Sequence, residues 1–117
     1  MNHNQAIGKW GEKAAEEYLR GKGFIILENN VRTPYGEIDI IASIEDLIVF
    51  VEVKTRTSRS FGYPEEALTY RKLGHMRASA EYYAARHAIG TWQCDAIAVE
   101  RTQDAGTHIE HFENVTS

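Results

Sequence analysis

Apolar positions recur along the chain with two different periods, and each period predicts a type of secondary structure. From Gln5 to Lys22, apolar and small residues return every three or four positions, which predicts a helix. The expected buried stripe of this helix consists of Ile7, Trp10, Gly11, Ala14 and Tyr18. A second helical pattern follows Thr69, a residue typical of helix N-caps, and continues to about His87.

Shorter apolar stretches predict strands between and after the two helices. These stretches are residues 24–32, 37–43, 47–55, 91–100 and 107–113. Turn residues separate the first three strands, with "TPYG" at 33–36 and an acidic turn at 44–46. The resulting order, α-β-β-β-α-β-β, predicts an α/β protein with a mixed central sheet flanked by helices. No linker or repeat divides the chain, so residues 1–117 are expected to form one domain.

Charged residues interrupt the second and third predicted strands, where apolar residues would be expected. Glu37 and Asp39 share one face of the second strand, and Glu52 and Lys54 share one face of the third. A short turn makes these strands neighbours. If the register places the charged faces on the same side, Asp39 and Glu52 converge.

Two converging carboxylates need a proton or a cation between them. At a separation of about 4 Å they repel by roughly 4 kcal/mol at an effective dielectric constant near 20. Mg²⁺ removes this cost because it binds a few carboxylate oxygens together with water and phosphate. Lys54 could then contact a water or phosphate oxygen at the metal, which is chemistry suited to phosphodiester hydrolysis. The alternative is a set of cross-strand ion pairs on a half-exposed sheet.

The first predicted helix carries three glutamates with different positions around its axis. Glu12 lies on the flank of the apolar stripe beside small residues, so it can lean over the sheet. Glu16 and Glu17 are expected to face solvent. Glu12 is therefore the glutamate that can join the carboxylates of the strands.

Composition limits the class of protein. The chain is 43% apolar and 26% charged, as in ordinary globular domains, and no apolar run is long enough to span a bilayer. Its single cysteine, Cys94, excludes an intrachain disulfide and a cysteine zinc cluster. There is no glycine-rich phosphate loop, so no nucleotide cofactor is expected. These features predict a cytoplasmic protein without a membrane partner.

Positive charge is concentrated in the middle of an acidic chain. The net charge is −4, yet residues 54–86 carry seven basic and three acidic side chains. The basic residues are Lys54, Arg56, Arg59, Arg71, Lys72, Arg77 and Arg86. This segment could contact a nucleic-acid backbone, with Arg71 and Lys72 helped by the dipole of the second helix. The alternative is a solvated helix face.

The motifs that carry these residues resemble a known family. "GKWGEKAAEEYLRGKGFIILENN", "GEIDIIA" and "VFVEVKTR", in this order, are similar to the YraN-like family of predicted endonucleases. That family resembles the archaeal Holliday junction resolvases of the PD-(D/E)XK nuclease superfamily. The resemblance extends from about residue 5 to residue 99. It implies a restriction-endonuclease-like αβββαβ core, Mg²⁺- or Mn²⁺-dependent cleavage of DNA, especially branched DNA, and a homodimer.

The resemblance also implies roles for individual residues. Asp39, Glu52 and Glu12 match metal-binding catalytic positions, and Lys54 matches the catalytic lysine. Lys72 also matches the family pattern. By their positions at the start of the second helix and directly after the candidate site, Arg56, Arg59, Arg71 and Lys72 are the expected substrate-binding residues. For Glu37 two roles are equally open, a further metal ligand or the ion-pair partner of a basic side chain.

Two departures from the nuclease pattern leave a second function open. Ile38 stands where the superfamily has a proline, and Gln93 stands where the family has an arginine. Asp95 is matched, but a structural hydrogen-bonding role is favoured over a catalytic one. The alternative function is a catalytically silent nuclease-like module that binds nucleic acid or a protein partner.

Overall fold

The computed structural model describes residues 3–56, 69–102 and 106–117 and confirms the predicted order of elements. The elements are α1 (His3–Gly21), β1 (Ile25–Thr33), β2 (Gly36–Ile44), β3 (Leu47–Arg56), α2 (Tyr70–Arg86), β4 (Trp92–Thr102) and β5 (Gly106–Phe112). Thr69 caps α2 as expected, because its hydroxyl accepts the backbone N–H of Lys72 at 3.2 Å.

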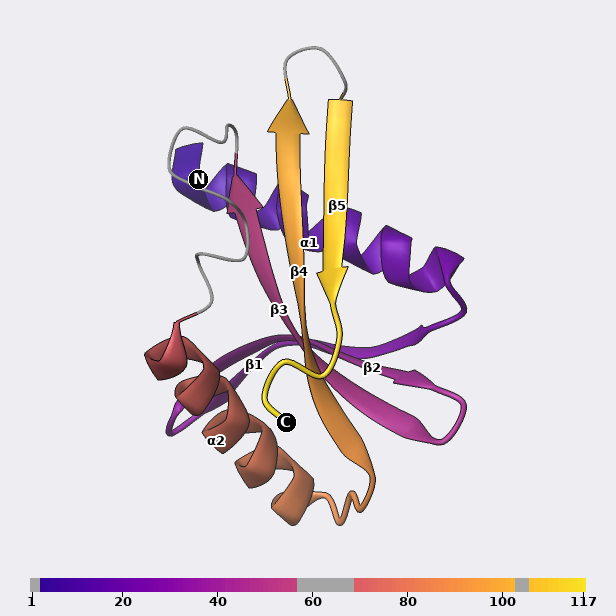
Figure 1. The fold of residues 1–117 in the computed structure, drawn as a ribbon, viewed down its shortest axis with the longest axis vertical. Coiled ribbons are helices and arrows are strands. Elements are labelled where there is room, and N and C mark those ends of the chain that lie inside the picture. Colours follow the sequence, from indigo (N-terminus) through magenta and orange to yellow (C-terminus); the bar gives the residue numbers. More distant parts are fainter. Residues whose placement is uncertain (1–2, 57–68, 103–105) are drawn as a thin grey trace.

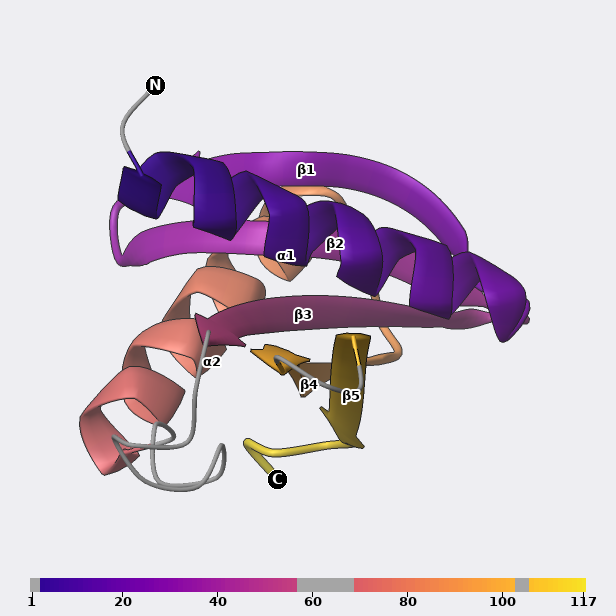
Figure 2. The same cartoon turned by 90° about the horizontal axis from the view of Figure 1, so that it is seen from above.

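The five strands form one mixed sheet in the order β1-β2-β3-β4-β5. Neighbouring strands are antiparallel except β3 and β4, which are parallel and are connected through α2. Figures 1 and 2 show α1 and α2 on opposite faces of this sheet. This arrangement confirms the predicted α/β class and is compatible with a restriction-endonuclease-like core. Within the described residues, no helix is long and apolar enough to cross a membrane.

Each helix covers its own apolar core. The core beneath α1 contains Ala15, Leu19, Ile40, Ala42, Val49, Val51, Val53, Ile97 and Val99. The core beneath α2 contains Ile38, Ile41, Phe50, Ala80, Ala84 and Cys94. Both sides of the central strands are thus buried, which explains their nearly continuous apolar sequence.

The buried line of α1 is rotated from the expected stripe. Gly11, Ala15 and Leu19 are the buried residues, whereas Trp10 and Tyr18 are only partly covered. The reason is a close approach between α1 and β3. A Cβ atom on Gly11 would lie 2.0 Å from Thr55 Oγ1, so only glycine fits at this contact.

Candidate metal and nucleic-acid site

The regular alternation of side chains in β2 breaks at Asp39. Ile40 and Ala42 pack into the core of α1, while Ile38 and Ile41 both pack into the core of α2. The pairing between β2 and β3 extends from Ile44 to Ile40 and stops there. The strands therefore separate where the charged residues begin, which explains why the sequence loses its alternation at this point.

The Asp39 carboxylate lies in the opening between the separated strands. Val53 donates its backbone N–H to Asp39 Oδ2 at 2.8 Å, so the side chain replaces the missing ladder acceptor. The register Ile40↔Val51 directs Asp39 toward Glu52, and the two carboxyl groups share a hydrogen bond. Asp39 and Glu52 thus meet although they come from different strands.

The electrostatic environment of Asp39 strongly favours its protonated form. Burial is the largest cause, followed by the hydrogen bond to Glu52 and the Glu52 charge, and together they raise the pKa of Asp39 to about 9. The more distant charge of Glu12 acts in the same direction, while the bond from Val53 opposes it. A cation beside Asp39 would offset the same repulsion that the proton now offsets.

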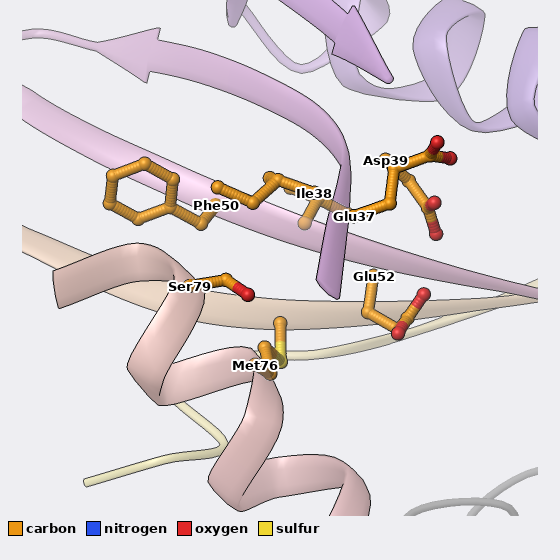
Figure 3. A pocket seen from close by; sticks show the side chains of 8 residues that line it. Glu37, Ile38, Asp39, Phe50, Glu52, Met76 and Ser79 are labelled. Carbon is orange, nitrogen blue, oxygen red and sulfur yellow. The ribbon is translucent and has the colours of Figure 1, made fainter. Parts of the chain in front are cut away.

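A small cavity lies beside this carboxyl pair, between β2, β3 and α2. Glu37, Asp39 and Glu52 line it together with the apolar side chains of Ile38, Phe50 and Met76. In Figure 3 the acidic side chains point away from Phe50 and gather at the same end of the cavity. The carboxylates of Glu37, Asp39 and Glu52 therefore form an acidic end of the cavity, called the acidic mouth below, and the rest of the lining is mostly apolar.

Glu12 and Glu37 are connected to each other by an asparagine that the sequence analysis did not identify. Asn30 Nδ2 lies 3.1 Å from Glu12 Oε1 and 3.3 Å from Glu37 Oε1. Asn30 has a φ of 51°, a conformation that asparagine tolerates better than most residues. The double asparagine at 29–30 was the available signal, but its spacing alone does not reveal which carboxylates it meets.

A second cavity of about 160 Å³ shares Glu37 and Glu52 with the first and contains two lysines. Glu52, Lys54, Lys72 and His75 are among the residues that line it. The Lys54 charge is the largest cause that lowers the pKa of Lys72, which shows that the two ammonium groups lie close together. Two neighbouring cations at an open surface form a natural position for a phosphate.

The remaining basic residues differ in their availability. Arg71 is exposed on the first turn of α2, and Arg56 is half-buried at the end of β3. Arg77 donates to the Thr116 carbonyl oxygen at 2.6 Å, so it holds the C-terminal segment. Arg59, an expected substrate-binding residue, lies outside the described residues.

Asp95 lies on the opposite face of the sheet, away from Lys54. It is 1% exposed, and its carboxylate accepts from Gln93 Nε2 at 2.9 Å and from the backbone N–H of Asn114 at 2.9 Å. His111 Nε2 lies 2.7 Å from Asp95 Oδ2, and Tyr18 Oη lies 3.0 Å from His111 Nδ1. This network gives Asp95 and Gln93 structural roles. The sequence did not predict that His111 takes part in it.

The solvent-facing position expected for Glu16 is wrong. Glu16 is half-buried, accepts from Asn29 Nδ2 at 2.7 Å and pairs with Arg20 at 3.2 Å. The close approach of α1 to the sheet brings this face of the helix against β1. Glu17 is exposed, as expected.

The site offers a divalent metal two converging carboxylates rather than a complete cage. Among the residues that the structure describes, no three His, Cys, Asp or Glu side chains are arranged to hold a metal ion together. Glu12 acts on Asp39 through its charge, and its hydrogen bond to Asn30 connects it to Glu37 and not to Asp39. Asp39 and Glu52 nevertheless fit Mg²⁺, which commonly takes one or two carboxylates and completes its shell with water and phosphate.

Fold and site together define an α/β protein with a carboxyl pair and a lysine pair where two central strands separate. The chain belongs to the uncharacterised protein family UPF0102, whose model matches residues 11–99. A UPF0102 protein of Syntrophomonas wolfei is 54% identical over 80 residues, which cover 68% of this chain and 70% of that protein. A UPF0102 protein of Syntrophotalea carbinolica is 43% identical over 92% of this chain and 88% of its own length. One of Beutenbergia cavernae is 39% identical over 98% and 99%.

Proposed function

We propose that this protein is a metal-dependent endonuclease that hydrolyses phosphodiester bonds of DNA, including branched or otherwise structured DNA. The observation that carries the proposal is the hydrogen-bonded pair of Asp39 and Glu52, with Lys54 on the same open face of the sheet. Such a pair is costly when it is partly withdrawn from water, and a proton or a cation can offset the repulsion.

Asp39 and Glu52 would hold Mg²⁺ or Mn²⁺ in this function. When bound, such an ion polarises a phosphate and supplies an activated water. Val53 fixes the orientation of Asp39 because its backbone N–H donates a hydrogen bond of 2.8 Å to Asp39 Oδ2. This ligand therefore needs little reordering. Glu12 and Glu37, which share Asn30, add negative charge that favours a cation at the acidic mouth.

The lysines act on the phosphate in this proposal. Lys54 is two residues beyond Glu52 on the same face, so its ammonium can stabilise negative charge that develops on the scissile phosphate. Lys72 comes from α2 and lies beside Lys54, where it can hold the same or the adjacent phosphate. Arg71 and Arg56 extend this basic surface from either side.

Cleavage of plasmid DNA and of a four-way junction, each with Mg²⁺ or Mn²⁺, tests the proposal. Asp39→Asn should abolish detectable metal-dependent cleavage, and Lys54→Ala should slow single-turnover cleavage by about 10²- to 10³-fold. Asp46→Asn is the matched control for the aspartate, because Asp46 is exposed at the far end of the same hairpin. Lys13→Ala, on exposed α1 surface, is the control for the lysine.

A catalytically silent binding module is the second candidate. The absence of a three-ligand group among the described residues and the net charge of −4 favour it. DNA binding without metal-dependent, Asp39-dependent cleavage would select this candidate over the endonuclease.

A further inference from the structure

An exposed aromatic ring lies on the rim of the cavity that contains the lysine pair. Tyr35 lines the 160 Å³ cavity together with Lys54, Lys72 and Glu52, and it is 53% exposed. It belongs to the tight turn between β1 and β2, directly after Pro34. The groups proposed to bind phosphate and an aromatic surface are thus neighbours.

The turn that carries Tyr35 is fixed by a small hydrogen-bond network. Thr33 Oγ1 accepts the Tyr35 backbone N–H at 3.1 Å and lies 2.8 Å from the Gly36 carbonyl oxygen. The same hydroxyl lies 2.9 Å from Ser79 Oγ, which connects the turn to α2. Gly36 has a φ of +139°, a conformation that favours glycine. The backbone beneath the ring is therefore held in one geometry.

The ring itself is supported by a second aromatic side chain. Tyr35 and Tyr82 meet edge to face, with centroids 6.2 Å apart and an interplanar angle of 67°. Arg86 lies over the Tyr82 ring at 5.3 Å. The contact with Tyr82 restrains the ring before any ligand binds, which lowers the entropic cost of stacking, and about half of Tyr35 stays exposed to a ligand.

We propose that Tyr35 stacks on an unpaired DNA base next to the phosphate bound by Lys54 and Lys72. The preferred substrate is then DNA with a single-stranded segment at the site, such as a flap or an opened branch. Inside a duplex both faces of a base are covered by its neighbours, so the ring can stack only where a base is unpaired. This inference rests on the proposed function for the identity of the phosphate site.

The charge of the protein agrees with a substrate recognised partly by stacking. Duplex binding depends on many contacts between cations and phosphates, and this chain has a net charge of −4. Part of its basic segment is engaged elsewhere, since Arg77 holds Thr116 and Arg86 covers Tyr82. Stacking adds affinity without adding positive charge.

Binding of 2-aminopurine probes in EDTA tests the inference without cleavage. One probe is a duplex with a single-stranded tail that carries the fluorescent base beside the junction, and the other is a fully paired duplex of the same sequence. We expect the wild-type protein and Tyr35→Phe to bind the tailed probe more tightly than the fully paired duplex and to quench its fluorescence. Tyr35→Ala should weaken binding of the tailed probe by about five- to hundred-fold, with little change for the duplex.

Leu27→Ala is the control, because Leu27 is 48% exposed on β1 and is not among the residues that line the cavity. Thermal unfolding of each variant checks that the turn remains folded. The inference is overturned if Tyr35→Ala binds the tailed probe like the wild type, or if it weakens both probes equally. Since binding is read without metal, failure of this test leaves metal-dependent cleavage intact, and failure of cleavage leaves the binding result valid.

Discussion

Asp39 and Asp95 occupy the same sheet yet have opposite surroundings. Asp95 on β4 is surrounded by donors, namely Gln93, the Asn114 backbone and the His111 ring. Asp39 on β2 receives one backbone N–H from Val53 and otherwise meets the carboxyl group of Glu52. One carboxylate is fully partnered by the fold, and the other is placed against a second acid.

The partners of a carboxylate distinguish a structural role from a ligand-binding role more reliably than its burial does. A carboxylate surrounded by donors stabilises the native state and needs nothing further. A carboxylate opposed by another acid destabilises the native state unless a proton or cation binds. Asp95 therefore connects α1, β5 and the C-terminal segment through His111 and Tyr18, whereas Asp39 marks the place where a ligand is needed.

The largest expected effect on folding is that of removing the Asp95 carboxylate. Asp95→Ala leaves three partly buried donors without their buried acceptor and should lower the free energy of unfolding by about 3 kcal/mol. Urea denaturation followed by circular dichroism measures this change. Asp46→Ala, in the exposed turn of the β2–β3 hairpin, should change it by less than about 0.5 kcal/mol. A similar small loss for both variants would contradict a structural role for Asp95.

Asp39→Asn should stabilise the metal-free protein, whereas Asp95→Ala destabilises it. The amide removes the repulsion from Glu52 and keeps an oxygen for the Val53 N–H, so the free energy of unfolding at neutral pH should rise by about 1–2 kcal/mol. Asp95→Asn is the matched substitution and should lower it. Equal destabilisation by both would show that the two aspartates do not differ as described.

The gain from Asp39→Asn should depend on pH in a defined direction. The folded-state pKa of Asp39, about 9, exceeds the ordinary value of 3.8. The free energy of unfolding of the wild-type protein therefore falls as pH rises between these two values. Below both values Asp39 is protonated in the folded and unfolded states and the gain disappears. Denaturation at acidic, neutral and weakly alkaline pH in EDTA measures this trend, and a gain that shrinks with rising pH would contradict it.

The elements of the fold could be predicted from sequence because their signals are local. Helical spacing, the Thr69 cap and the turns at 33–36 and 44–46 each act over a few residues, and the structure confirms them. The short turn before Leu47 also made Asp39 and Glu52 neighbours, because a hairpin fixes which positions can face each other. Their catalytic roles stay predictions.

The supporting contacts could not be predicted because they depend on how distant elements approach one another. Gly11 reads as a weak helix residue until Thr55 is found against it. Asn30 and His111 become important only when α1 lies across the sheet and brings Glu12 and Tyr18 to them. The sequence carries these residues without marking their partners, since hydrogen bonds between distant positions leave no periodic signal.

The smallest effect concerns divalent metal and sharpens the contrast most directly. Mg²⁺ binding to Asp39 and Glu52 should stabilise the wild-type protein by about 1.4 kcal/mol at a concentration ten times the dissociation constant. Asp39→Asn should lose this stabilisation, while Asp95→Asn and Lys54→Ala should keep it, because neither changes the carboxyl pair. Thermal unfolding in EDTA and in Mg²⁺, with NaCl added to equal ionic strength, measures the shift. An equal shift in Asp39→Asn would place the bound ion elsewhere on this acidic protein and would remove the argument that the opposed carboxyl groups attract it.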